Sequence, residues 1–593
     1  MTIQRITFSV WLVLLISACS SNPVKITGGS NDGYQKLRID LDKNIPRVID
    51  KHDLASMVVL VVDDQDVVYA NGFGYANSEQ NRITTPDTAY RIGSISKLFT
   101  AIAIMQLHEQ GKLDIDQPLK RYLPEFSINT PYGVESITLR SMLSHYSGLP
   151  SDYVKGFTDY EAEQTMLEAL SVDHVAYKAE EVHAYSNLAY GILGLVIERV
   201  SGLSYPEYLE KHLFAPLGMS NASLGNTVQD NFAVTFLDDE VMQPVEIRDR
   251  AAGDLRMSAN DLGLFAKEML KYTHAGNKTT PKLLSRTSLL EMWEPQYKDA
   301  PVDSGFEMGL GWILSYPNKT LGNMTDLVWH NGGTFHYHSA LLLSREHKIA
   351  VIVFSNFADT NESVTGEVAE NTLLSAIRSK NGYQPEPYLP KSRATKHFSS
   401  EQANLLTGRY LSSEIGEFTV ERDGDTLFAR FDGQKAYLVP MDDGSVGVKF
   451  RLFGLIPFTP AEIKDLRFNL VNYDNTQVVK VVNGGPAIGQ KAQQKTLPDS
   501  IEKYLGNYRI TNPDSWPLGM NTKGLTISKA NGYLRVDIIT DEEPQIGYLE
   551  VVSDGYAKLI GYGRSKGNAV LFDVNDQGIP TVYYSGLRFE KSD

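Results

Sequence analysis

The chain has 593 residues, of which 42% are apolar and 22% charged, with a formal net charge of −16. This length predicts two to four domains, and the composition is that of a globular protein without a wholly disordered domain. The acidic balance and the lack of any Lys/Arg run argue against nucleic acid as a partner.

The first residues indicate export. The stretch from Phe8 to Ile16 is apolar but shorter than the ~20 residues a membrane-spanning helix needs, which predicts a signal peptide over residues 1–19. Its end, Ile16-Ser17-Ala18-Cys19, holds the only cysteine of the chain and resembles a bacterial lipobox. That resemblance implies a lipid on Cys19 and an anchor in the bacterial outer membrane, facing the periplasm; an ordinary cysteine is the alternative. Residues 20–35 then form a tether.

Residues 36–380 show the pattern of a mixed α/β domain. Strand-like runs flank a polar turn near the start, two strongly apolar helices fill the middle, and alternating strands return near the end. The predicted elements are a helix over 34–51, a hairpin over 57–69, helices from Lys97 to before Gly111 and from Asn187 to Ser201, and strands over 329–354. An α/β sandwich follows, in which both ends of the domain share one antiparallel sheet and the middle forms a helical subdomain.

The remainder of the chain reads as two copies of a small β domain. A proline-containing linker over residues 381–398 precedes it. Gly408-Arg409-Tyr410 matches Gly506-Asn507-Tyr508, and similar strand patterns follow each of these triplets. We therefore expect two antiparallel, barrel-like domains over 399–495 and 496–593. Neither copy shows a cluster of catalytic groups, so the chemistry is expected in the first domain.

Ser94 and Lys97 are the candidate nucleophile and base. Ser94 directly precedes the first apolar helix, where backbone N–H groups and the helix dipole favour developing negative charge. Lys97 lies one turn later on the same face, and apolar packing should lower its pKa enough for the amine to accept the serine proton. An N-cap serine beside a solvated lysine is the structural alternative.

Two further motifs add candidate partners. Tyr185-Ser186-Asn187 begins the second apolar helix, where the amide can bind a substrate carbonyl and the phenol can transfer protons. His330-Asn331-Gly332-Gly333 lies in a strand, and glycines there suggest close approach of a ligand to the backbone. Each motif alone has a structural alternative, an ordinary helix start or turn glycines.

Together these motifs resemble a known family. The stretch from about Ile45 to Ile377 is similar to the serine β-lactamase and penicillin-binding-protein-like hydrolases, in the branch of class C β-lactamases, D-aminopeptidases and esterases. Further landmarks of that branch are Leu143-Ser144-His145-Tyr146-Ser147-Gly148-Leu149-Pro150, Pro216-Leu217-Gly218-Met219, Ala252-Gly253-Asp254-Leu255 and Gly309-Leu310-Gly311-Trp312. The resemblance implies a β-lactamase-like sandwich for the first domain.

The resemblance also implies roles for the site residues. Ser94 would form an acyl-enzyme, and Lys97 and Tyr185 would share general-base and general-acid duty. Asn187 and Gly332 would contact substrate, and the N–H groups of Ser94 and Gly333 would form the oxyanion hole. The catalytic His330 would occupy the position at which β-lactamases carry the Lys of Lys-Thr-Gly.

No cofactor and no metal are expected. His336 and His338 fall on one strand face but lack a third ligand, so they read as surface or rim histidines.

The first functional hypothesis is a hydrolase of amides or esters, acting on D-amino-acid or peptidoglycan-derived peptides. Because His330 replaces a lysine, efficient antibiotic hydrolysis is not expected. A carboxylesterase or weak β-lactamase is the alternative, and an inactive sensor or binding module is the alternative from another class. The expected partners are a small peptide or ester and, through the lipid, a membrane. A D-aminopeptidase of this family carries two C-terminal β-barrel domains that bear on its active site, which implies substrate gating by the tail.

Overall fold

The computed structural model describes most of the predicted first domain, residues 36–380, and of the two predicted β domains, residues 399–495 and 496–593. It describes residues 32–157, 163–225, 230–237, 240–242, 245–273, 281–303, 307–316, 320–321, 323–334, 336–357, 362–383, 385–386, 393–395, 397–431, 433–452, 456–458, 466–482, 487–512, 522–540 and 544–592. The signal peptide with Cys19 and most of the tether lie outside the described residues, as does part of the linker over 381–398.

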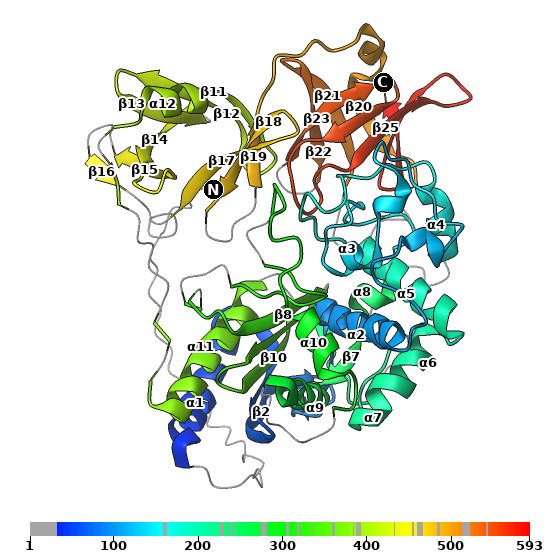
Figure 1. Ribbon diagram of the computed structural model, residues 1–593, viewed down its shortest axis with the longest axis vertical. Coiled ribbons are helices and arrows are strands. Elements are labelled where there is room, and N and C mark those ends of the chain that lie inside the picture. The colour runs from blue at the N-terminus through cyan, green and yellow to red at the C-terminus, as the bar shows by residue number, and fades with distance from the viewer. Residues whose placement is uncertain are drawn as a thin grey trace.

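An antiparallel six-stranded sheet lies at the centre of the first part (Figure 1). In sheet order its strands are β3 Arg82–Ile83, β2 Asp66–Asn77, β1 Leu54–Asp63, β10 Ile349–Phe357, β9 Tyr337–Ser344 and β8 Leu327–Thr334. Strand β1 pairs with its sequence neighbour β2 and with β10, nearly 300 residues later. The two ends of the domain therefore share one sheet, which confirms the predicted fold class.

Helices cover both faces of this sheet. The side chains of β1 alternate between two hydrophobic clusters, so Met57, Val59 and Val61 face α1 and α11, while the intervening residues face α2 and α9. All of these strand residues are buried, as expected for a strand packed on both faces. The helices are α1 Gln35–His52, α2 Ser96–Glu109, α3 Leu139–Leu143, α4 Glu163–Leu170, α5 Asn187–Ser201, α6 Tyr205–Leu209, α7 Ala215–Leu217, α8 Arg250–Gly253, α9 Ala259–Leu270, α10 Arg286–Met292, α11 Glu362–Asn381 and, beyond the domain, α12 Ser400–Leu406.

The two apolar helices start at the same end of the molecule. Every residue of α2 from Ser96 to Leu107 is buried, because the helix carries apolar or small side chains on all sides and runs through the middle of the domain. Helix α5 packs against it and is capped by the Ser186 hydroxyl, which accepts the Ala189 N–H at 3.0 Å. Their adjacent N-termini bring the two motifs at 94–97 and 185–187 together.

The C-terminal part consists of two β-barrels. The nine-stranded sheet of the first barrel closes through the pairing of β14 with β15, with β16 as an extension of β15, and the second barrel is a closed ring of β20 to β27. The matched triplets at 408 and 506 begin the first strand of each barrel. First-barrel strands are β11 Gly408–Ser412, β12 Gly416–Asp423, β13 Thr426–Phe431, β14 Gln434–Pro440, β15 Val446–Leu452, β16 Ile456–Phe458, β17 Arg467–Tyr473, β18 Thr476–Val481 and β19 Ala487–Lys491. Second-barrel strands are β20 Gly506–Ile510, β21 Gly524–Ala530, β22 Tyr533–Ile539, β23 Gln545–Ser553, β24 Tyr556–Leu559, β25 Ala569–Val574, β26 Pro580–Tyr584 and β27 Leu587–Ser592.

The second barrel lies against the helical side of the first domain, near α3 and α4 (Figure 1). Its contacts there include the segment from Ser151 to Lys155, whose Val154 N–H donates to the Ser585 carbonyl at 3.0 Å, and the stacking of His174 on Tyr556. Among the helices of the described residues, none combines the length and the hydropathy that crossing a membrane requires.

Candidate active site

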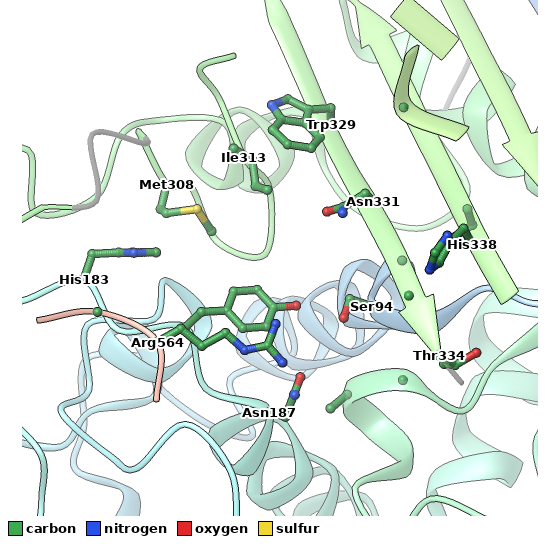
Figure 2. A pocket seen from close by; sticks show the side chains of 18 of the residues that line it. Ser94, His183, Asn187, Met308, Ile313, Trp329, Asn331, Thr334, His338 and Arg564 are labelled. Carbon is green, nitrogen blue, oxygen red and sulfur yellow. The ribbon is translucent and has the colours of Figure 1, made fainter. Parts of the chain in front are cut away.

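A cavity of about 1100 Å³ opens above Ser94, between the first domain and both barrels. Figure 2 shows Asn331 projecting into it from β8 and Arg564 entering from the opposite side. The residues that line it near the nucleophile are Ser94, Tyr185, Asn187, Asp249, Ala252, Gly253, Asn331, Gly332, Gly333, Thr334 and Arg564. Its outer walls add Phe157, His183, Ile247, Val302, Asp303, Met308, Ile313, Tyr316, Thr320, Trp329, His338, Ser339, Thr365, Gly366, Glu367, Glu370, Asn371, Glu414, Ala487, Tyr562, Gly563 and Lys566.

Ser94 occupies the 3₁₀ turn Gly93–Ile95 that leads directly into α2. Gly93 has φ +52°, and a Cβ there would lie 2.7 Å from the Gly333 nitrogen, so this turn approaches the end of β8 closely. The Ser96 hydroxyl fixes the turn, since it donates to the Gly93 carbonyl at 2.6 Å and accepts the Leu255 N–H at 3.1 Å. Ser94 is thus held at the positive end of a buried helix.

Lys97 is fully buried beneath Ser94. Its Nζ lies 3.1 Å from Ser94 Oγ, 2.7 Å from Asn187 Oδ1 and 2.7 Å from the Ala252 carbonyl. Burial lowers the pKa of Lys97 well below 10.5, and the positive charge of Arg564 lowers it further. The amine is therefore biased toward its neutral form. That form has two N–H donors, which Asn187 and Ala252 accept, and a lone pair that remains for the Ser94 hydroxyl proton.

Tyr185 stands beside the same pair. Its side chain is hydrogen-bonded to Ser94, and burial raises the pKa of the phenol to about 12. The Tyr185 ring lies 4.8 Å from Lys97 Nζ and packs 4.1 Å from the ring of His145, centroid to centroid. His145 is buried there with Nδ1 accepting the Ser186 N–H at 3.1 Å. The phenol is consequently neutral and fixed in orientation.

Asp152, which no sequence motif marks, orients the side-chain amide of Asn187. Asp152 Oδ1 accepts the Asn187 Nδ2–H at 2.7 Å, which leaves Asn187 Oδ1 to face Lys97. The Asp152 carbonyl in turn accepts the hydroxyl of Ser585 from the second barrel at 2.8 Å. No motif marks Asp152, which follows the landmark ending at Pro150.

The free edge of β8 faces Ser94. Trp329 exchanges backbone hydrogen bonds with Ile313 on the side away from β9. Because N–H directions alternate along an antiparallel strand, Asn331 and Gly333 direct their N–H groups to that same side. Gly333 can therefore present its N–H to the cavity next to Ser94, where the sequence placed the oxyanion hole.

Gly332 holds the 3₁₀ turn against β8, and substituting it should break that contact. A Cβ at residue 332 would lie 1.9 Å from the Ile92 carbonyl oxygen and 2.4 Å from Ser339 Oγ. We expect Gly332→Ala to lower the free energy of unfolding by about 1–3 kcal/mol, because the backbone must shift to relieve the overlap. Urea unfolding measures this. Gly366→Ala is the matched control, since nothing lies within 4 Å of a Cβ there; equal stability of the two variants would contradict the expectation.

His330 lies behind the cavity wall. Its side chain is 1% exposed and is not part of the cavity lining, and its ring centroid is 6.3 Å from that of Tyr185. Burial, together with the charge of Lys97, lowers the pKa of His330 to about 3. Its Nδ1 lies 2.6 Å from the Asn331 carbonyl, so the neutral ring carries its proton on Nδ1. His330 is thus no cationic counterpart of a lysine, and a catalytic role for it stays a prediction.

Of the two paired histidines, His338 is buried and lines the cavity, rather than lying at the surface. His338 is in β9, its ring 4.4 Å from that of Phe357, and His336 precedes the strand. Within the described residues, no group of three or more His, Cys, Asp or Glu side chains is arranged to hold a metal ion.

Arg564 is the contribution to the cavity that sequence reasoning missed. It belongs to the Arg564 loop, residues 560–568, which joins β24 to β25 of the second barrel. Its guanidinium carbon lies 5.1 Å from the centroid of the Tyr185 ring, and its side chain points toward Ser94 and Asn187 (Figure 2). The one sequence signal was a cluster of glycines around two cations, Gly561-Tyr562-Gly563-Arg564-Ser565-Lys566-Gly567.

Comparisons with known proteins match the first domain to one family. The family model described as Beta-lactamase matches residues 41–373, more than half of the chain. Beta-lactamase-like protein 2 of Dictyostelium discoideum is 26% identical over 72% of this chain and 81% of its own. Penicillin-binding protein 4* of Bacillus subtilis is 25% identical over 63% of this chain and 84% of its own. The crystal structure of SurE, 19% identical, covers 78% of this chain and 100% of its own with a TM-score of 0.54.

Proposed function

The chain belongs to the β-lactamase family of serine hydrolases, and from that premise we propose that it cleaves an amide or ester through a covalent acyl-enzyme on Ser94. The observation that carries this proposal is the contact of Ser94 Oγ with a buried lysine amine at 3.1 Å and with the phenol of Tyr185. A nucleophile in contact with both a base and an acid is the arrangement that acyl transfer requires.

The environments of Lys97 and Tyr185 divide the proton transfers between them. Burial lowers the pKa of Lys97 and raises that of Tyr185 to about 12. Two titratable groups whose pKa values are pushed apart in this way are suited to opposite roles. Lys97 is therefore the general base and Tyr185 the general acid.

The reaction proceeds in two halves. Ser94 Oγ loses its proton to Lys97 and bonds to the carbonyl carbon, while the N–H groups of Ser94 and Gly333 stabilise the oxyanion. Tyr185 gives its proton to the leaving nitrogen or oxygen as that bond breaks, and the proton on Lys97 restores the phenol. Lys97 then accepts a proton from a water molecule as that water attacks the carbonyl of the acyl-enzyme. The bond to Ser94 Oγ breaks, the carboxylic acid product leaves, and the Ser94 hydroxyl is restored.

The substrate class that this site supports best is a peptide or amide derived from D-amino acids or peptidoglycan. The cavity holds far more than a small ester, and Asn187 and the edge of β8 offer the amide and N–H groups that bind a peptide. The neutral, buried His330 supplies no cation at the position where β-lactamases carry a lysine, so that contact to an anionic β-lactam is missing. An envelope location with a lipid on Cys19 would place the protein beside such peptides.

A substrate panel tests the proposal. Purified protein is assayed on D-amino-acid amides, D-Ala-D-Ala peptides, β-lactams and short esters, with Ser94→Ala as the background. Turnover of the peptides or amides above that background is the expected result. Turnover confined to short esters selects a carboxylesterase, and no Ser94-dependent turnover of any compound selects the inactive binding module.

Tyr185→Phe should separate substrates by their leaving groups. Without the phenol no group protonates the leaving nitrogen, so kcat on an amide should fall about 10²–10³-fold. A 4-nitrophenyl ester needs no such protonation and should lose much less. Steady-state kinetics on both substrates measures the difference, with Tyr190→Phe as control, since the Tyr190 hydroxyl binds the Leu143 carbonyl instead. Equal losses on amide and nitrophenyl ester would rule out Tyr185 as the acid.

A further inference from the structure

The positive charge that is exposed in the cavity comes from outside the first domain, whose own charged side chains in the lining, Asp249, Asp303, Glu367 and Glu370, are acidic. Only two cationic side chains, Arg564 and Lys566, line the cavity within the described part of the chain, and both belong to the second barrel. Lys566 is paired with Glu414 of the first barrel at 3.2 Å. The guanidinium of Arg564 has no hydrogen-bond or ion-pair partner among the described residues, and its side chain is exposed to the cavity. It is therefore a cation available to a ligand.

The Arg564 loop is held in place by the first domain. The Tyr177 hydroxyl donates to the Gly561 carbonyl at 3.0 Å, and the Ser565 N–H donates to Ser151 Oγ at 2.7 Å. At Gly567 the backbone has φ +70° and passes so close to the Tyr177 ring that a Cβ would lie 2.5 Å from it. These contacts flank Arg564 on both sides, so its guanidinium is positioned rather than free to leave the site.

Arg564 does not block the nucleophile. The cavity retains its volume of about 1100 Å³ with the side chain in its wall, and Ser94 still lines it. Figure 2 shows the guanidinium directed to the same space as Ser94 and Asn187. A group bound to Arg564 would thus belong to the molecule whose carbonyl reacts with Ser94.

We propose that Arg564 is the specificity-determining receptor for a carboxylate of the substrate, delivered to the active site by the second barrel. A guanidinium presents a planar pair of N–H donors that matches a carboxylate, and a partly enclosed site strengthens that bond. The inference rests on the proposed function, because it concerns the substrate of Ser94. The carboxylate lies either in the acyl part or in the leaving group.

Two pairs of matched esters test the inference and distinguish these positions. The acyl pair is mono-4-nitrophenyl glutarate and 4-nitrophenyl pentanoate; the leaving-group pair is 3-acetoxybenzoate and 3-acetoxybenzamide. For each pair the ratio of kcat/KM, anionic over neutral, is measured in wild type, Arg564→Gln, Arg564→Lys and Lys566→Gln. Rates in Ser94→Ala are subtracted, and thermal unfolding confirms that each variant is folded.

In one pair the wild type should prefer the anionic ester, and Arg564→Gln should lower that ratio about tenfold or more. Arg564→Lys should retain part of it, and Lys566→Gln, whose charge is paired with Glu414, should retain the wild-type ratio. If the esters are turned over and wild type and Arg564→Gln give the same ratio for both pairs, the inference is wrong while the proposed function stands. An equal fall of the ratio in Lys566→Gln has the same consequence. If no ester shows Ser94-dependent turnover, the proposed function fails and the inference falls with it.

Discussion

Ser94→Ala is expected to lower kcat/KM by about 10⁴- to 10⁶-fold on whichever amide or ester the wild type turns over. The variant retains Lys97, Tyr185 and the N–H groups at the end of β8 but has no oxygen to form the acyl-enzyme. Ser94 is a partly exposed residue of a short turn, so the fold should be unaffected. Steady-state kinetics with a thermal unfolding curve measures both.

The neighbouring serine of the motif supplies the control. Ser96 is buried, and its hydroxyl bonds to the Gly93 carbonyl and the Leu255 N–H, so Ser96→Ala should destabilise the turn but keep the nucleophile. It should still react with a fluorophosphonate at Ser94. Activity in Ser94→Ala within about tenfold of wild type would contradict the assigned nucleophile.

Lys97→Met is expected to lower kcat by about 10²–10⁴-fold, the usual contribution of a general base. Methionine has a similar length and suits a fully buried position, so the loss reflects the missing amine. Lys97→Arg is the informative partner, because a guanidinium keeps the charge but cannot give up its proton. If Lys97 acts as a base, both variants lose activity. Recovery of most activity in Lys97→Arg, in a protein that unfolds like wild type, would assign Lys97 the role of a cation.

The pH dependence of kcat/KM also distinguishes Lys97 as a base from Lys97 as a cation. The active form holds Lys97 neutral, so kcat/KM should rise with pH and level off above the pKa of that amine, which burial keeps well below 10.5. As pH falls below this pKa, activity should fall about tenfold per unit. Arg564→Gln removes a charge that lowers the pKa, so its acid limb should lie at higher pH. A rate that instead fell with rising pH through this range would indicate a required ammonium.

The sequence predicted those parts of the structure whose cause is local. Helix α2 was recognisable because it has no polar face, which only a helix through the domain centre can tolerate, and α5 because Ser186 caps an apolar run. Both motifs lie at helix starts. Their common location follows once α2 and α5 pack side by side, as the structure confirms.

The residues that were missed depend on how the domains dock. Ser565 and Ser151, whose bond fixes the Arg564 loop, are 414 positions apart, and no periodicity or spacing relates them. Asp152 accepts the Asn187 amide within the first domain, and its carbonyl accepts the Ser585 hydroxyl, a contact that exists only after the second barrel has docked. The expectation that chemistry lies in the first domain therefore omitted one wall of the cavity.

His330 shows a different limit of motif reasoning. The motif gave its position in the chain, but strand alternation turns Trp329 and Asn331 toward the cavity and His330 away from it, and Thr334 joins the lining at the end of β8. Asn331 lay inside the quoted motif without an assigned role, yet it is exposed to the cavity beside Ser94. Burial of His330, which makes its ring neutral, could be learned only from the packing around it.

The most direct test of Ser94 as the acylated residue is the mass of the protein after reaction. Wild type is incubated with a penicillin or a fluorophosphonate, and the intact mass and its peptides are measured beside Ser94→Ala. We expect one adduct on the peptide that contains Ser94 and none in the variant. No adduct on the wild type, or the same adduct on Ser94→Ala, would contradict it.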